Sequence, residues 1–427
     1  MRSRVLWRRS ATAIWAYIAT ALGFLTTVVA TRELHNAYGK FAAVFAATIF
    51  FQVLFDLTFE EALVKYGFRY TESQHWGRLR RLFDLALRVK LLGGLLGALA
   101  MVALAPFAKQ FWGSGGVFVP MLIAAALPIA QAPETVAAGA IILRGRYDIR
   151  AAFLAISMAF RLVGLAIGCR YGVTGAVIGL VVAQVVATAA ICPVGINAFR
   201  RFPSSPAEPF AEDRAGLRSF LFQSTVVSSL VSGRAALGTA LMPTVASFAQ
   251  TGYFRNAQAP ATGLAAISGP ARLVLLTEQT RDFEAGRHDR MYAMLRRYIT
   301  GTTLAMVVAV PLLWWWMPFL MGLAYGHAFR VHAATAARLV LLAAAIQFIF
   351  GWTKSFPVSI GRPGLRIIAQ SVEIAVFVPL LLVFASKWGA TGGAAATLVS
   401  TVVFCAVWVV LLARIRNDRV RTKALAT

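Results

Sequence analysis

Charged side chains that interrupt long apolar runs are the residues of this sequence with the clearest chemical potential. Arg161, Arg234 and Arg272 each lie inside such a run, and so do Glu134 and Glu373. An ionised side chain in hydrocarbon is costly, so such residues face a partner or a hydrated cavity and mark ligand or ion pathways. An arginine there suits an anion, because it stays charged and can donate two hydrogen bonds at once. The competing interpretation is a structural ion pair or, for Arg272, snorkelling to the nearer interface.

The runs that hold these charges identify a membrane protein. Of the 427 residues, 59% are hydrophobic and only 14% are charged, whereas a soluble domain has about 25% charged residues. We predict an all-α polytopic membrane protein with about 12 transmembrane helices, because a helix needs about 20 apolar residues to cross a bilayer. The windows fall at roughly 11–31, 41–64, 84–107, 118–143, 150–169, 173–197, 219–241, 253–276, 298–318, 334–356, 366–385 and 391–413.

The net charge of +25 is interpreted as topology and not as nucleic-acid binding. Cytoplasmic loops of membrane proteins carry an excess of lysine and arginine. With the N-terminus inside, the inner segments hold 31 of the 42 basic residues. We therefore expect a multi-pass protein of a cytoplasmic (inner) membrane, with both termini in the cytoplasm and no nucleic-acid partner.

The chain repeats itself at an offset of roughly 213–217 residues. Four short motifs recur in the same order, each with a glycine, which indicates two homologous halves. We predict an N-terminal six-helix bundle over 1–200, a cytoplasmic linker over 201–217 and a C-terminal six-helix bundle over 218–427, with the substrate site between the two bundles. The matched glycines are Gly39 and Gly252, Gly113 and Gly326, Gly145 and Gly361, and Gly172 and Gly389.

Pairs of glycines four residues apart predict close contacts between helices, because a helix without side chains at these points lets a neighbour approach. The pairs are Gly93 and Gly97, Gly164 and Gly168, and Gly175 and Gly179.

Motifs for ATP, dinucleotide or metal chemistry are missing from the sequence. It has no GxxxxGK[ST], GxGxxG or HExxH motif, so we expect no cofactor, no metal and no enzymatic activity. Outer loops are too short for a glycosyltransferase or polymerase, and no cytoplasmic segment can house an ATPase. A secondary transporter is the expectation that remains.

Four stretches resemble one family. They are TRELHNAYG at 31–39, DLTFEEALV at 56–64, GYFRNA at 252–257 and GATGGAA at 389–395. Together they resemble motifs of the bacterial polysaccharide-type (oligosaccharidyl-lipid) flippases, within the multidrug/oligosaccharidyl-lipid/polysaccharide exporter superfamily. The chain departs from that pattern at His35 and Asn36, where the family usually has Gly-Pro, and at Thr58, where it usually has glycine.

The resemblance implies two six-helix bundles around a central cavity. It also implies a flippase that moves a polyprenyl-diphosphate-linked oligosaccharide from the inner to the outer leaflet, by alternating access, for cell-surface polysaccharide assembly. Its partners would be that lipid, the bilayer and a polysaccharide polymerase or glycosyltransferase. A diphosphate needs cationic ligands inside a membrane. On this hypothesis the diphosphate-binding residues are Arg234, Arg272, Arg32 and Arg255.

Acidic residues carry the remaining expectations. Asp56, Glu60 and Glu61 are candidates for coupling to an ion or for gating, with interfacial solvation as the alternative. Structural ion pairs are expected between Glu134 and Arg161 and between Lys354 and Glu373. The alternative function is an H⁺- or Na⁺-coupled small-molecule exporter of the same superfamily, but cationic candidates favour an anionic lipid.

Overall fold

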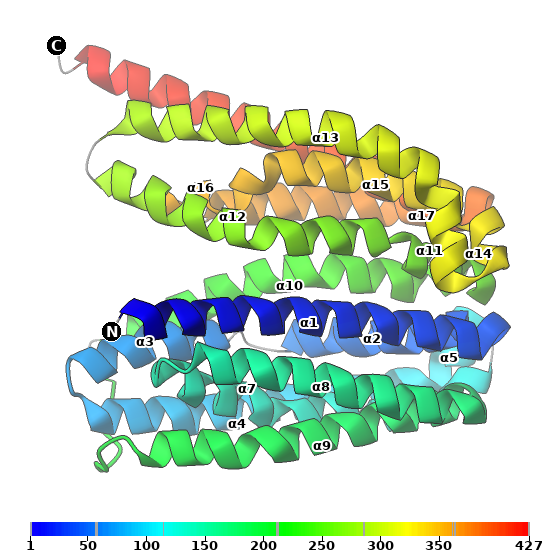
Figure 1. Ribbon diagram of the computed structural model, residues 1–427, viewed down its shortest axis with the longest axis horizontal. Helices are drawn as coiled ribbons and strands as arrows, with labels where there is room; N and C mark the ends of the chain where they lie inside the picture. The colour runs from blue at the N-terminus through cyan, green and yellow to red at the C-terminus, as the bar shows by residue number, and fades with distance from the viewer. Residues whose placement is uncertain are drawn as a thin grey trace. The chain divides into compact units, whose positions relative to one another are not determined.

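The computed structural model describes the backbone of residues 2–425 except 56–58, 114, 211–212, 285–286, 361 and 363. Within it, side chains are not described at 2–9, 115, 231, 269–274, 276–277, 280–281, 283–284, 288, 358 and 416–425. The regular structure of the described residues is helical and contains no strand. The chain divides into two compact units, residues 1–244 and 245–427 (Figure 1).

The first unit is a bundle of long helices in which α1 packs against α8, α8 and α7 pack against α9, and α4 packs against α7 (Figure 1). Its helices are α1 (Arg2–Leu34), α2 (Tyr38–Phe55), α3 (Phe59–Glu72), α4 (Trp76–Leu104), α5 (Ala108–Trp112), α6 (Phe118–Ala124), α7 (Ala126–Leu143), α8 (Tyr147–Gly168), α9 (Gly172–Arg200) and α10 (Asp213–Val245).

The second unit is built around α15, which packs against α12, α13 and α17 (Figure 1). The segment α17 consists of two helices in succession, because the backbone leaves helical geometry at Gly389. The elements of this unit are α11 (Phe248–Ala257), α12 (Ala259–Glu284), α13 (His288–Tyr325), α14 (His327–His332), α15 (Ala334–Ile349), the 3₁₀ turn η5 (Phe350–Lys354), α16 (Phe356–Ser359) and α17 (Gly364–Leu425).

The prediction of an all-α polytopic membrane protein is confirmed. Seven segments in the described residues are long and apolar enough to cross a membrane, and the bent helix α10 is an eighth. Three of the seven are 63, 54 and 52 residues long, more than twice the length that one crossing needs. The predicted windows coincide mainly with helix. The window 253–276 is not among the eight segments, and it is divided between α11 and α12.

Two of the four glycine pairs matched in the sequence share a positive φ. Gly113 and Gly326 have φ of +65° and +101°, and Gly172 and Gly389 have φ of +74° and +55°. This left-handed region is one that glycine enters without steric penalty. Gly113 follows α5 and Gly326 follows α13, whereas Gly172 begins α9 and Gly389 lies between the two helices of α17. The equivalence of the two halves stays a prediction.

The linker predicted over 201–217 packs on the first unit. The ring of Phe202 is buried, and the guanidinium of Arg144 lies 3.8 Å from its centroid. Arg144 Nε also donates to the carbonyl oxygen of Ala198 at 3.1 Å. Burial, together with the charge of Arg201, lowers the pKa of Arg144. The boundary between the compact units comes later, at 244/245, and the division into two functional bundles at the linker stays a prediction.

Close packing between α8 and α9 follows the predicted glycine pairs. A Cβ atom on Gly164 would collide with the carbonyl oxygen of Gly179, and one on Gly168 with that of Gly175. On α4, a Cβ atom added to Gly94 would lie 2.8 Å from the carbonyl oxygen of Pro128, which is too close. A Cβ atom added to Gly97 would make only ordinary van der Waals contacts. Backbone contact of this kind leaves no room for a side chain.

We predict that Gly179→Leu destabilises the protein, because its side chain would have to separate α8 from α9. Overpacking of this kind costs about 1–3 kcal/mol or more, which should lower the melting temperature in detergent by several degrees. Gly301→Leu is the matched control, since an added Cβ at Gly301 meets nothing within 4 Å. Equal melting temperatures for the two variants would contradict the close contact.

Candidate functional site

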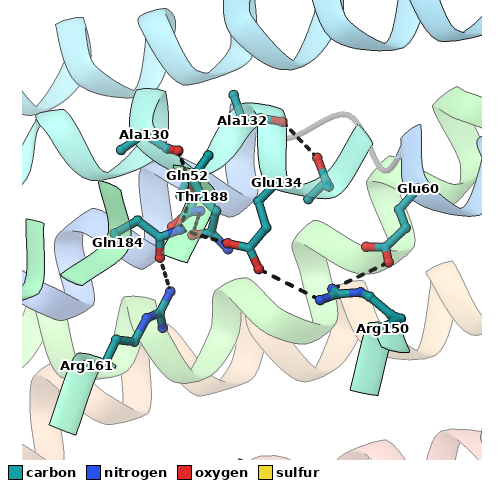
Figure 2. A network of polar contacts seen from close by, with 11 residues as sticks. Gln52, Glu60, Ala130, Ala132, Glu134, Arg150, Arg161, Gln184 and Thr188 are labelled. Carbon is teal, nitrogen blue, oxygen red and sulfur yellow. Dashed lines mark hydrogen bonds and ion pairs between the residues drawn. The ribbon is translucent and has the colours of Figure 1, made fainter. Parts of the chain in front are cut away.

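A buried polar network joins three helices of the first unit (Figure 2). Its centre is Gln184 of α9, which has no solvent exposure. Arg161 Nη2 of α8 donates to Gln184 Oε1 at 2.5 Å, and Gln184 Nε2 donates to Glu134 Oε2 of α7 at 2.7 Å. Gln184 Nε2 also donates to Thr188 Oγ1 at 3.1 Å, and the Thr188 hydroxyl donates to the carbonyl oxygen of Ala130 at 2.9 Å. The structure therefore brings Glu134 and Arg161 together with Gln184 lying between them.

Arg150 extends this network towards α3 (Figure 2). Its Nη1 lies 3.8 Å from Glu134 Oε1 and its Nη2 lies 3.8 Å from Glu60 Oε1. The side chain of Glu134 is 9% exposed and that of Glu60 is 39% exposed. Two carboxylates and two guanidiniums thus balance in formal charge. The two contacts of Arg150 are ion pairs longer than a hydrogen bond, and its buried Nη1 has no hydrogen-bond partner among the described residues.

A small polar cavity of about 40 Å³ lies between α2, α4 and α7 of the same unit. Gln52 Nε2 donates to Gln131 Oε1 at 2.6 Å beside it, and Thr135 also lines it. Lys90, only 6% exposed, is the cationic member of this lining. The volume is sufficient for a water molecule. A buried lysine among amides in a membrane helix is a functional candidate.

Lys90 and Gln184 are not among the site residues that the sequence predicts. From the sequence, Lys90 counts among the basic residues of the inner segments. In the structure it lies inside the long helix α4. The pair Gly93 and Gly94, one turn later, is the signal that could have revealed close packing around it. Gln184 carries no charge, so it does not stand out as a candidate within the apolar window 173–197.

Helix α10 combines a bend with a buried cation. Its two segments, Asp213–Leu230 and Ser232–Val245, meet at an angle of 41°. Arg234 comes directly after this bend, and its Nη1 is buried. Before the bend, the Ser229 hydroxyl donates to the carbonyl oxygen of Val53 at 3.1 Å, and the Ser224 hydroxyl donates to Glu61. Glu61 of α3 therefore contacts α10, the helix that carries Arg234.

The other predicted diphosphate ligands are spread over both units. Arg32 is exposed in the last turn of α1, and Arg255 is half-buried on α11. Arg272 lies on α12, but its side chain is outside the described residues. Asp56, the first of the predicted coupling carboxylates, is also outside them. The gathering of the four arginines around one ligand stays a prediction.

The second unit has polar residues of its own. Glu373 of α17 is 2% exposed and accepts a hydrogen bond from Gln370 Nε2. Lys354 ends η5, and its pairing with Glu373 stays a prediction. Gln347 Nε2 donates to Thr401 Oγ1 at 3.2 Å, which ties α15 to α17. In the part of the chain that the structure describes, no three His, Cys, Asp or Glu side chains are grouped to hold a metal ion.

No protein-family model matches the chain, and no curated protein matches its sequence. Solved structures do match its fold. An inward-facing multidrug resistance MATE family transporter of the MOP superfamily superposes with a TM-score of 0.71, at 14% identity over 97% of this chain and 98% of that one. The lipid II flippase MurJ, in an inward closed conformation, gives a TM-score of 0.73 at 14% identity, over 94% of this chain and 87% of that one.

A MOP superfamily transporter from Pyrococcus furiosus gives a TM-score of 0.63 at 12% identity, over 97% of this chain and 96% of that one. At such identities the likeness is one of fold. The chain therefore has the fold shared by multidrug transporters and a lipid flippase, and that fold extends over nearly all of its length.

Proposed function

We propose that this protein is a secondary transporter of the MOP superfamily, and that it flips a polyprenyl-diphosphate-linked oligosaccharide from the inner to the outer leaflet of a bacterial cytoplasmic membrane. The shared fold supports the class of protein, since the neighbours named above are a multidrug transporter and a lipid flippase. The motifs that resemble polysaccharide-type flippases support the finer assignment. A polysaccharide polymerase or glycosyltransferase would then act on the delivered lipid.

The observation that carries this proposal is the position of Arg234. It follows the 41° bend of α10, has a buried guanidinium nitrogen, and shares its helix with hydroxyl-bearing serines. Interrupted helices near the middle of a membrane are typical of substrate sites in transporters. A guanidinium there suits a diphosphate, since the charge persists and the fork of donors matches phosphate oxygens.

The second candidate is an ion-coupled exporter of small molecules. One observation favours it: the chain covers 98% of the MATE transporter but 87% of the lipid II flippase, so its extent matches the former more closely. In that case the substrate would be a small molecule, and a carboxylate such as Glu61 would exchange the coupling ion.

Transport assays in liposomes separate the two candidates. We expect the purified protein to flip a fluorescent polyprenyl-diphosphate oligosaccharide without ATP, and to leave a fluorescent organic cation untransported under a proton or sodium gradient. Transport of the cation alone would favour the exporter. A requirement for ATP with every gradient absent would contradict the secondary-transporter class for both candidates.

The proposed orientation has its own test. In a variant without Cys169, Cys192 and Cys405, we expect Ser73→Cys to resist an impermeant thiol reagent in intact cells, because it lies in the exposed turn before α4 on the arginine-rich side. Lys109→Cys should react, because Lys109 is exposed on α5. The opposite pattern would invert the topology.

A further inference from the structure

The first unit also contains a cavity lined by several arginines, and Arg234 is not one of them. A cavity of about 570 Å³ lies between α4, the start of α10 and the chain at Pro209 and Phe210. We call it the arginine cavity. Its lining comprises Arg81, Asp84, Leu85, Arg88, Pro209, Phe210, Arg214, Leu217, Arg218 and Leu221.

The spacing of its arginines places them on two facing helix surfaces. Arg81 and Arg88 are seven residues apart on α4, and Arg214 and Arg218 are four residues apart on α10. Both intervals return to the same face of a helix. Asp84 is the only carboxylate among the described residues of the lining, whose formal charges sum to +3. Among the described residues, no ion pair joins any of the four arginines to a carboxylate.

The walls of the arginine cavity are fixed by contacts that do not use its four arginines. Asp213, at the start of α10, accepts from the Tyr70 hydroxyl at 3.2 Å and pairs with Arg69 at 2.8 Å and Arg78 at 3.7 Å. Leu217 is 2% exposed within the core that also includes Phe210 and Tyr70. These contacts hold the start of α10 beside α3 and α4, and the charged side chains of the cavity are exposed at its surface.

The linker is fastened to α4 as well. The backbone N–H of Glu208 donates to the carbonyl oxygen of Gly77 at 3.1 Å. A Cβ on Gly77 would come within 2.5 Å of the carbonyl oxygen of Pro206, so a glycine is needed where the linker crosses the helix. The segment that leads to Pro209 and Phe210 is therefore held in place.

Exposed apolar side chains continue from the arginines along both helices. On α4, Leu92, Leu95 and Leu99 follow Arg88 at intervals of four, seven and eleven residues and are 59%, 46% and 54% exposed. On α10, Phe222 follows Arg218 by four residues and is 70% exposed. The same helix faces thus pass from a cationic cavity to surfaces that suit hydrocarbon chains.

We propose that the arginine cavity binds the phosphate headgroup of an anionic membrane phospholipid, whose acyl chains lie along the leucines of α4. Guanidinium groups bind phosphate strongly and bidentately, and basic clusters beside membrane helices attract anionic lipids. The polar side chains of the lining are all charged, and the rest is apolar. Four guanidiniums beside apolar side chains thus offer ligands for a phosphate next to hydrocarbon chains.

This inference does not depend on which substrate the protein transports. The bound lipid would hold α10 to α4 by linking arginines of both helices. We therefore expect it to stabilise the first unit where the linker meets the bundle.

The test measures lipid binding by native mass spectrometry of the full chain, with short-chain phosphatidylglycerol as the probe. In the test variant, Arg81, Arg88, Arg214 and Arg218 are all replaced by glutamine. We expect its Kd for phosphatidylglycerol to be at least tenfold weaker, since each basic residue near a lipid surface contributes measurably. The control variant replaces Arg290, Arg296, Arg297 and Arg362 by glutamine, four exposed arginines outside the cavity, for the same loss of charge. It should bind like the wild type.

Three results would overturn the proposal: equal binding by the test and control variants, equal binding of phosphatidylcholine and phosphatidylglycerol, or displacement of the bound lipid by inorganic phosphate or by polyprenyl diphosphate at the same concentration. The melting temperatures of both variants without lipid check that folding is intact. If the test variant fails to fold, the pair Arg81→Gln and Arg88→Gln, on α4 alone, gives the same comparison, with a weaker Kd supporting the proposal and an unchanged Kd opposing it.

Discussion

Arg234→Ala is expected to abolish transport of the lipid-linked oligosaccharide while folding and membrane insertion stay normal. The guanidinium follows the bend of α10, and it would meet the diphosphate only during transport. On this proposal Arg234 lines the substrate site, where truncation would leave helix packing intact, whereas loss of the charge would leave the diphosphate without compensation in a medium of low polarity. Arg234→Lys should restore activity only in part, because an ammonium keeps the charge but loses the bidentate geometry.

The measurement is complementation in cells, beside the melting temperature of each purified variant. Arg170→Ala is the matched control, since Arg170 is exposed in the turn before α9. A structural ion pair would behave differently: its loss would lower the melting temperature, and Glu61→Gln, which removes the carboxylate bound by Ser224 of α10, would recover it. Full activity of Arg234→Ala at normal expression would exclude Arg234 as an essential ligand.

The positions of the helices could be predicted because the membrane imposes a simple rule. About 20 apolar residues must be continuous for a helix to cross, and such windows coincide mainly with helix in the structure. The repeat was also accessible, since glycines such as Gly172 and Gly389 are needed for positive φ at equivalent turns. Both signals can be found in the sequence without knowledge of which helices pack together.

The polar network could be predicted only in part. Charges inside spans identify Glu134 and Arg161, because ionised groups stand out in an apolar sequence. Their connection through Gln184 depends on the packing of α7, α8 and α9, which no local pattern specifies. From the sequence, Arg150 is assigned to an inner loop, because it stands at the start of a predicted span. In the structure its guanidinium lies 3.8 Å from both Glu134 and Glu60.

The linker shows a similar limit. Its prolines and serines indicate a connection between halves, but not that Glu208 bonds to Gly77 or that Phe202 is buried. The start of α10 is fixed by Asp213 through partners on α3 and α4. Such contacts join residues more than a hundred positions apart, and composition alone does not reveal them.

Glu134→Gln is expected to destabilise the protein strongly, whereas Glu60→Gln should change its stability little. Both carboxylates lie 3.8 Å from the same guanidinium, that of Arg150, but their side chains are 9% and 39% exposed. Breaking a buried ion pair on one side costs about 3–5 kcal/mol, because a buried charge is left uncompensated. An exposed pair contributes about 0–1 kcal/mol.

Glu134 has a further role that Glu60 lacks, since it accepts from Gln184, which also holds Arg161. Loss of the Glu134 charge therefore leaves two cations, Arg150 and Arg161, with less compensation. The double variant Glu134→Gln, Arg161→Gln should consequently melt at a higher temperature than Glu134→Gln alone. Melting temperatures in detergent, with transport assays at equal expression, give the comparison. If Glu134→Gln instead melts like the wild type but no longer transports, the network is not structural. Glu134 would then be a group that must gain and lose a proton or cation in each cycle, and that result would favour the ion-coupled exporter over the flippase.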